Sequence, residues 1–305
     1  MSIYGGDMAS QRSGSVKEIV SIDDETLEFA FSDRISVFDM PIPSIIPGKG
    51  ATLCAEGVFW FRRAEKMGIH THFIEQTAPN RMRVKKVDII RDYDAITPET
   101  TSYLIPLEFI ARHYVAGSLH DRLQKGKIAP EEVGFPAGHI PSYGERLPMP
   151  YIETSTKLER VDRLLDEKEA LAISGLTPSE YDSIINIILD IDRDIEAQVS
   201  SRGLIHVDGK KEFAFDEDRN IMVIDVYGTA DEDRFWDKAA WERGSIVELS
   251  KEFVRKYYES IGYKTALYGA RERGETEPEI PPLPPDIIAK AAQFYQDIKY
   301  KITGE

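Results

Sequence analysis

The residues best suited to chemistry lie in the segment LIHVDGKKEFAF, Leu204–Phe215, and in the apolar run IMVIDV that follows it. If the first segment is a strand, Asp208, Lys210 and Glu212 point to one face, because side chains alternate along a strand. Asp225 interrupts the otherwise apolar second run. Carboxylates that converge from adjacent strands suit nucleotide-bound Mg²⁺, and a neighbouring lysine can neutralise a phosphoryl group. The pattern favours such a site, and a solvated charged face is the alternative.

Two glycine-containing segments are candidates for binding phosphate. In GSVK, Gly14–Lys17, the glycine lets backbone amides approach an anion and the lysine adds a positive charge. Its spacing is not that of a Walker loop, and a flexible turn that enters a strand is the alternative. GKG, Gly48–Gly50, precedes a predicted helix and could hold an anion at the helix N-terminus, although most such triplets are loops.

A third group of residues lies in EFIARHYVAGS, where Glu108 and Arg112 fall on one face of either a strand or a helix. The planar guanidinium can bind a carboxylate or a phosphate, and Gly117 and Ser118 offer an amide and a hydroxyl beside it. An ion pair within the segment is the alternative. Arg234, in RFWD, could supply another guanidinium to an anionic ligand or border an aromatic anchor.

The overall charge narrows the range of partners. Acidic residues (53) outnumber basic ones (38), so the formal net charge is −15. Such a surface repels phosphate backbones and anionic lipid, which disfavours nucleic-acid and membrane partners. An anionic ligand therefore needs a local basic pocket. The single cysteine, Cys54, excludes an intrachain disulfide and a thiolate metal cluster, and together with the absence of an apolar signal core it fits a cytoplasmic protein.

Apolar periodicity and turn residues predict an α+β protein, and a length of 305 residues suggests two domains or one domain with elaborations. The expected parts are a domain at residues 1–95, a domain at 96–244 and a helical extension at 245–305. The expected strands are Val16–Val20, Thr26–Phe31, Ile35–Phe38, Thr71–Glu75, Met82–Ile90, Tyr103–Val115, Leu204–Asp208, Lys211–Phe215 and Ile221–Val226, the last two forming a hairpin. The expected helices are Ala51–Met67, one that begins at the capping box Thr177–Glu180 and ends at Gly203, Val247–Tyr263 and Ile287–Lys301. Loops are expected at Pro41–Gly50 and Gly126–Pro150, and a stiff proline-rich strap at Glu277–Asp286.

Taken together, the motifs resemble those of the phosphoribosylaminoimidazole-succinocarboxamide synthase (SAICAR synthetase) family. The resemblance runs from about Gly14 to Asp237, and the sequence after about Gly244 adds little to it. The matching motifs, in order, are SDRISVFD with IIPGKG at Ser32–Gly50, GIHTHFI at Gly68–Ile74, VKKV at Val84–Val87, PLEFIARHYVAGS at Pro106–Ser118, STKLE at Ser155–Glu159, HVDGKKEF at His206–Phe213 and DRFWD at Asp233–Asp237.

The resemblance implies a ligase that uses ATP and Mg²⁺ to join L-aspartate to carboxyaminoimidazole ribonucleotide (CAIR), giving SAICAR, ADP and phosphate. It also implies a small strand-rich ATP-covering domain on a larger α+β domain that holds substrate and metal, followed by C-terminal helices. Carried over by position, the ATP-binding residues would be Gly14, Ser15, Val16, Lys17, Lys85, Lys86, Val87, Lys210 and Glu212, with Mg²⁺ on Glu212 and Asp225. CAIR would be bound by Glu108, Arg112, Gly117, Ser118 and Arg234, and aspartate by the segment that contains Ser36, Asp39 and Lys49.

Three positions depart from the usual pattern of the family. Ser15 stands where a lysine is usual, Val226 where an acidic residue often follows the metal-binding aspartate, and Gly209 where an aromatic residue is common. Each departure concerns a single contact and leaves the implied reaction unchanged.

Several alternatives stay open at the level of sequence. A small-molecule kinase would use the same ATP and metal site, but it would not need aspartate. A nucleotide-binding module without catalysis is a second alternative, although Lys210 and Glu212 are both present. Lys210 is expected to contact phosphates, and Asp208 is a candidate for the base that deprotonates the aspartate amine. The oligomeric state is open; the helical tail could form a homo-oligomer interface.

Overall fold

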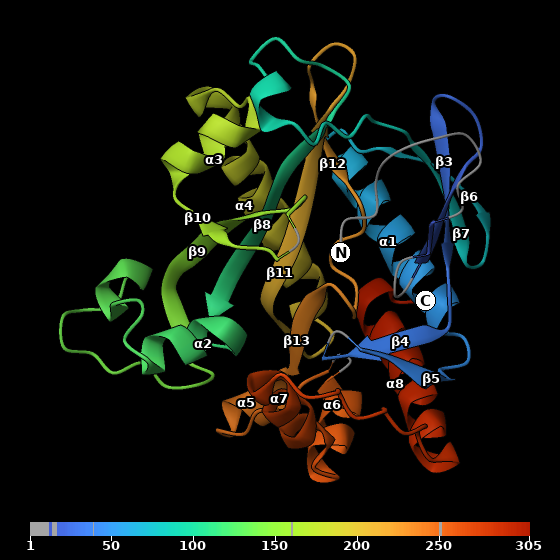
Figure 1. Ribbon diagram of the computed structural model, residues 1–305, viewed down its shortest axis with the longest axis vertical. Helices are drawn as coiled ribbons and strands as arrows, with labels where there is room; N and C mark the ends of the chain where they lie inside the picture. The colour runs from blue at the N-terminus through green and yellow to red at the C-terminus, as the bar shows by residue number, and fades with distance from the viewer. Residues whose placement is uncertain (1–11, 14–16, 39, 160, 250–251) are drawn as a thin grey trace.

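The structure is a computed structural model that describes residues 12–13, 17–38, 40–159, 161–249 and 252–305. A strand-rich N-terminal part with one long helix lies beside a larger antiparallel sheet, and helices from the end of the chain pack below and behind both (Figure 1). This arrangement confirms the predicted α+β class.

The N-terminal sheet positions Lys17 and the segment after residue 84. Its strand order is β1-β2-β3-β7-β6, with every neighbouring pair antiparallel. The strands are β1 (Arg12–Ser13), β2 (Lys17–Ser21), β3 (Thr26–Phe31), β6 (Phe73–Ala78) and β7 (Arg81–Lys85). Helix α1 (Lys49–Lys66) covers one face, where Phe29, Val84 and Phe61 are buried in one core. The β3 prediction is confirmed residue for residue.

The predicted loop at Pro41–Gly50 is wrong over its first half. Residues Met40–Ile45 form β5, which pairs antiparallel with β4 (Arg34–Val37). Along β5, Ile42 and Ser44 are buried, while Pro41 and Pro43 are exposed. A proline that lacks an N–H is tolerated at such positions of a two-stranded ribbon, so its presence did not exclude a strand.

The larger sheet carries most of the predicted site. Its order is β10-β9-β8-β11-β12, and β13 also pairs with β11. The strands are β8 (Leu104–Tyr114), β9 (Arg146–Thr156), β10 (Leu164–Leu165), β11 (Leu204–Phe215), β12 (Ile221–Ile224) and β13 (Asp233–Asp237), all paired antiparallel. The β11–β12 hairpin is confirmed, but β11 is one continuous strand rather than two. Strand β9 starts inside the predicted Gly126–Pro150 loop, so that prediction is wrong at its C-terminal end.

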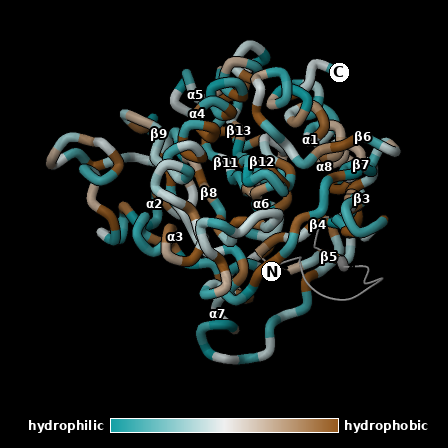
Figure 2. The backbone as a smooth tube through the Cα atoms, turned by 90° about the horizontal axis from the view of Figure 1, so that it is seen from above, coloured by the Kyte–Doolittle hydropathy of each residue, from teal (hydrophilic) through white to brown (hydrophobic). Residues whose placement is uncertain are grey.

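Helices cover one face of this sheet. Helix α4 (Pro178–Ser200) begins at the predicted capping box, where the Thr177 hydroxyl accepts from the Glu180 amide and the Glu180 side chain accepts from the Thr177 amide. The remaining short elements around the sheet are η1 (Tyr93–Ala95), α2 (Gly117–Gln124), η2 (Pro130–Val133), α3 (Glu167–Ser174) and α5 (Lys238–Glu242). The α4 side chains Ile184, Ile188 and Ile195 are fully buried. Figure 2 shows apolar segments, in brown, near β8 in the middle of the molecule.

The C-terminal part contains three helices, α6 (Glu252–Ser260), α7 (Tyr263–Arg273) and α8 (Pro285–Thr303). The helix predicted at Val247–Tyr263 is confirmed as α6, but it is shorter than predicted, and Gly262, with a left-handed φ of 76°, separates it from α7. Helix α8 packs on α1, where Gln296 donates to Thr52. One core cluster includes residues from all three predicted parts, and their exact boundaries stay a prediction. Among the described residues, no helix is long and apolar enough to cross a membrane.

Candidate active site

Strands β8, β11 and β12 bring the predicted carboxylates together. Glu108 lies opposite Glu212 across the β8–β11 pair, and Glu212 lies opposite Ile224, the residue before Asp225. Asp225 has a left-handed φ of 56°, a conformation that is costly outside glycine and that concentrates at functional sites. Glu212 and Asp225 are both buried, so the alternative of a solvated charged face does not fit.

Lysines surround these carboxylates. Lys210 Nζ lies 2.8 Å from Glu212 and 3.2 Å from Glu108. Lys157 makes a close ion pair with Glu212 and lies 3.4 Å from Glu108, and Lys17 pairs with Asp225. We call Lys17, Glu108, Lys157, Lys210, Glu212 and Asp225 the lysine–carboxylate cluster. Lys210 and Glu212 are on one face of β11, as the alternation predicted.

Opposing effects set the protonation of this cluster. Burial alone would raise the pKa of Glu212, but Lys157 and Lys210 hold it well below its usual range. Burial and then the Glu212 carboxylate raise the pKa of Glu108. Burial would lower the pKa of Lys157 and of Lys210, yet Glu212 raises both. The cluster therefore holds charged lysines in a water-poor site, where their fields act strongly on an anion.

Arg112 lies on β8, four residues after Glu108. Its guanidinium donates to Ser118 Oγ at 3.0 Å, lies 3.5 Å from Asp208 and makes a close ion pair with Glu153. Glu108, in contrast, pairs with lysines. Among the described residues, then, the ion pairs of Glu108 and Arg112 run across strands, which does not support the alternative of a pair within the segment.

Arg234, the second arginine predicted to bind an anion, lies near Asp208, as Arg112 does. Arg234 Nε lies 3.7 Å from Asp208, on the strand next to it. Gly117 has φ 50°, and a Cβ there would lie 2.8 Å from Arg234 Nη2, so only glycine lets the guanidinium pack this closely. Arg112, Gly117, Ser118, Asp208 and Arg234 are therefore contiguous, and we call them the arginine region.

A cavity of about 540 Å³ opens beside the arginine region. Its lining includes the predicted residues Ser36, Gly117, Ser118 and Arg234, drawn from segments far apart in the sequence. The sequence analysis missed other lining residues: His120 and Tyr143, and Arg255 and Lys264 from α6 and α7. The cavity walls are polar and carry both signs of charge, since Asp121, Glu248 and Glu259 line it as well, so an anionic ligand would be held at the cationic side chains.

Lys49 is not brought to this cavity. Its side chain has no exposed surface and pairs with Asp231 at 2.7 Å. The amides of Gly48 and Gly50 donate to the carboxylate of Asp33, so this helix N-terminus is capped by the protein itself. The prediction of Lys49 as an aspartate ligand is therefore wrong for this conformation.

Some predicted site residues fall outside the residues that the structure describes, and others lie at the end of β7 or just after it. Gly14, Ser15, Val16 and Asp39 fall outside the described residues. The side chains of Lys85 and Lys86 are exposed, and that of Val87 is partly buried. The amides of Lys85 and Lys86 donate to the carbonyls of His72 and Glu25, so neither is available to a ligand without breaking a bond.

Lys157 is the residue of the cluster that sequence reasoning missed. It lies inside the STKLE motif, directly after β9, and its side chain is only 5% exposed. A single lysine after a strand that was itself not predicted gave no reason to choose it. The matching motif was the only signal that could have found it.

The chain is similar to known proteins over nearly its whole length. A family model described as SAICAR synthetase matches residues 10–268. A phosphoribosylaminoimidazole-succinocarboxamide synthase of Thermoplasma acidophilum is 51% identical over 292 residues, which cover 96% of this chain and 97% of the relative.

Solved structures show the same fold. A SAICAR synthetase (type 2) in complex with ADP has a TM-score of 0.69 at 26% identity, covering 97% of this chain and 98% of that one. The SAICAR synthase of Saccharomyces cerevisiae complexed with SAICAR has a TM-score of 0.76 at 21% identity, covering 100% and 99%, and supports the fold. With a family model over most of its length and a relative at 51% identity, the chain belongs to the SAICAR synthetase family.

Proposed function

We propose that this chain is the ATP-dependent ligase that joins L-aspartate to CAIR, giving SAICAR, ADP and phosphate. The observation that carries the proposal is that the lysine–carboxylate cluster and the arginine region share strands β8 and β11. Lys210 and Asp208 are two residues apart on β11, about 6.6 Å along the strand. A phosphoryl group held at Lys210 would thus lie beside a substrate held at Arg234 and Arg112.

The reaction has two steps that share this site. The carboxylate oxygen of CAIR attacks the γ-phosphorus of ATP, ADP leaves, and an acyl phosphate forms. The aspartate amine then attacks the acyl carbon and phosphate leaves, while the amine loses a proton. Lys157 and Lys210 would stabilise the charge of the transferring phosphoryl group, since positioning and electrostatics do most of the work in such transfers.

The carboxylates of the cluster fit a magnesium ion by their chemistry. Mg²⁺ takes oxygen ligands and usually binds through one or two carboxylates together with phosphate oxygens. Glu212 and Asp225 meet that requirement, because the hairpin pairing places them next to each other. When bound, Mg²⁺ neutralises phosphate charge and orients the phosphoryl group. We propose that Lys17, Lys157 and Lys210, which now pair with these carboxylates, would turn toward the phosphates.

At the substrate end, we propose that Arg112, Ser118 and Arg234 bind the anionic groups of CAIR, with Gly117 beside them and Glu108 contacting CAIR from the lysine–carboxylate cluster. Arg112 supplies a planar fork that a lysine cannot replace. Ser36 lines the same cavity, so it is retained for the aspartate, together with Asp39, whose placement is not described. Asp208, between two guanidinium groups, is our candidate for accepting the amine proton.

At the nucleotide end, we propose that residues 14–17 cover the ATP phosphates and that the backbone of residues 84–87, including Lys85, Lys86 and Val87, holds the adenine. Lys17 supports this placement, because it lies against the carboxylate proposed to hold the metal. The amides of Lys85 and Lys86 are already bonded, so the adenine contacts would fall on other backbone groups of the segment.

The partners that follow are small molecules, and nucleic acid is disfavoured by the net charge of −15. We propose a cytoplasmic location, which fits the single cysteine. A homo-oligomer remains a prediction that analytical ultracentrifugation would test.

Phosphate release measured with ATP, Mg²⁺ and CAIR, with and without aspartate, tests the function. We expect release that depends on both substrates and a product with the mass of SAICAR. The small-molecule kinase alternative predicts that a phosphorylated acceptor accumulates without aspartate, and that outcome would overturn the proposal.

A further inference from the structure

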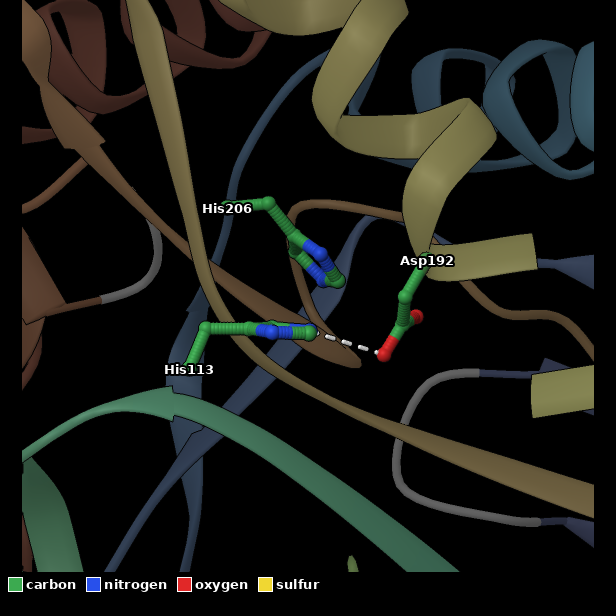
Figure 3. Close-up of side chains that lie close together, drawn as sticks. All are labelled: His113, Asp192 and His206. Carbon is green, nitrogen blue, oxygen red and sulfur yellow. Dashed lines mark hydrogen bonds and ion pairs between the residues drawn. The ribbon is translucent and has the colours of Figure 1, made fainter. Parts of the chain in front are cut away.

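A group of polar side chains lies on the face of the large sheet that α4 covers. His113 Nε2 lies 2.9 Å from Asp192 of α4, and His206 Nε2 lies 2.7 Å from Asp233. Lys211 pairs closely with Asp192 and lies 3.7 Å from Asp233. Figure 3 shows His113 and His206 from neighbouring strands converging with Asp192. We call these five residues the rear network.

The rear network is almost completely buried. The side chains of Lys211, His206 and Asp233 are all 0% exposed. Burial would raise the pKa of Asp192, but Lys211 and then the two histidines lower it overall. A buried charge that loses its partner is strongly destabilising. The geometry around these charges is therefore held tightly.

Strand alternation places three of the five members of the rear network one residue from the proposed active site. His113 follows Arg112, Lys211 follows Lys210, and Asp233 precedes Arg234. Successive side chains of a strand point to opposite faces. A shift of the rear network would therefore move the site residues on the front of the same strands.

Asp233 also contacts the backbone of two neighbouring segments. Its carboxylate accepts from the amide of Gly228 at 2.9 Å, which ties down the segment that follows Asp225. A Cβ at Gly209 would collide with the same carboxylate, so the carboxylate packs directly on the backbone of β11. This close packing explains why glycine stands where the family often has an aromatic residue. The β11 register shift between His206 and Asp208 accompanies the turn of His206 toward Asp233.

His113, Asp192 and His206 could also be considered as metal ligands, because their ligand atoms all lie within 4.8 Å of one another. However, Asp192 already faces a cation, since Lys211 contacts one of its oxygens and His113 the other. A divalent ion there would lie beside the buried ammonium group, and charges of like sign repel strongly in a water-poor interior. The contacts therefore favour a hydrogen-bonded network over a metal centre.

We propose that Asp233, His206, Lys211 and Asp192 are positioning residues of the ligase, which fix Arg234 and Lys210 through the shared backbone of β11 and β13. This inference rests on the ligase function proposed above. It predicts that perturbing the rear network changes substrate use, although none of its members touches the front of the sheet.

The test compares His206→Leu, His206→Gln and Asp233→Asn with the wild type. Glutamine can still donate to Asp233, whereas leucine cannot. We expect His206→Leu and Asp233→Asn to raise KM for CAIR by at least about tenfold, since displacements of about 1 Å can cost this much or more. The affinity for CAIR, measured by calorimetry, should fall in parallel, and His206→Gln should restore most of it.

Asp194→Asn is the matched control. Asp194 lies two residues from Asp192 on α4 and pairs with Arg63, away from the site. The control should lower the unfolding temperature without changing KM. If Asp233→Asn does not fold, the two His206 variants decide the question.

Three outcomes would separate the claims. A wild type without aspartate-dependent phosphate release would refute the proposed function. An active wild type whose His206→Leu variant keeps a normal KM at a lowered unfolding temperature would show that the rear network only stabilises the fold. A stoichiometric transition metal in the purified wild type, lost in His113→Ala, would make it a metal centre and overturn the inference.

Discussion

Replacing Lys157 with methionine should destabilise the fold and abolish turnover together. Lys157 faces the buried carboxylate of Glu212 and the half-buried carboxylate of Glu108, which lie opposite each other on neighbouring strands. Methionine keeps the length of the side chain but removes its charge, so Lys210 alone remains close to both carboxylates. Removing one partner of a buried ion pair costs about 3–5 kcal/mol, and the 5% exposure of Lys157 places it in that class.

The assay is urea unfolding of four proteins: wild type, Lys157→Met, Glu212→Gln and the double variant. The double variant should be more stable than the sum of the single effects predicts, by about 1–3 kcal/mol, because no unpaired charge remains between the two positions. Arg163→Met is the control, since Arg163 pairs with Glu159 and Glu169 at the exposed surface and should change stability little. Additive effects of the single variants, or a Lys157→Met protein as stable as the control, would refute the assignment of Lys157 to the cluster.

Three further perturbations follow from the structure. Arg112→Lys should weaken CAIR binding by about 1.5–3 kcal/mol, because the bond to Ser118 at 3.0 Å and the planar fork are lost; unchanged affinity in calorimetry would leave Arg112 a purely structural role. Lys17→Ala should raise KM for ATP at least about tenfold with CAIR affinity intact, since the lysine acts in a water-poor site; normal ATP dependence would mean that this strand does not cover the phosphates. Burial, opposed by the Ala230 amide, raises the pKa of Glu56 from its usual 4.5 to about 8, so the folded state holds this proton more tightly than the unfolded state. Wild-type stability should therefore fall as the pH rises from about 4.5 to about 8, and Glu56→Gln should remove that part of the fall in unfolding temperature; identical pH profiles would contradict the assignment.

The front of β11 could be predicted from sequence because alternation is a local property. Asp208, Lys210 and Glu212 share a face whatever surrounds the strand, and the Glu212–Asp225 proximity follows from a hairpin between adjacent segments. Local reasoning could not place Lys49, because its partner, Asp231, comes from a distant segment, and Asp33 takes the amides of Gly48 and Gly50.

The rest of the site depends on contacts between distant parts of the chain. Lys157 joins the cluster only because β9 pairs with β8, and β9 begins in a segment whose prolines and glycines predicted a loop. From the sequence alone, Lys211 looks like a second surface lysine next to Lys210. In the structure its side chain is fully buried and pairs with Asp192 of α4. Arg255 and Lys264 line the cavity because the C-terminal helices fold back against the sheet, which no periodicity in their own sequence indicates.

The most direct test of the central claim follows the oxygen atoms of the CAIR carboxylate. If ATP activates this carboxylate as an acyl phosphate, CAIR labelled with oxygen-18 in the carboxylate should transfer one labelled oxygen to each phosphate released in the presence of aspartate. Mass spectrometry of the phosphate measures this transfer. Labelled phosphate that appears together with SAICAR is the predicted result. Unlabelled phosphate, or phosphate transfer that needs no aspartate, would contradict the claim that the lysine–carboxylate cluster and the arginine region form one ligase site.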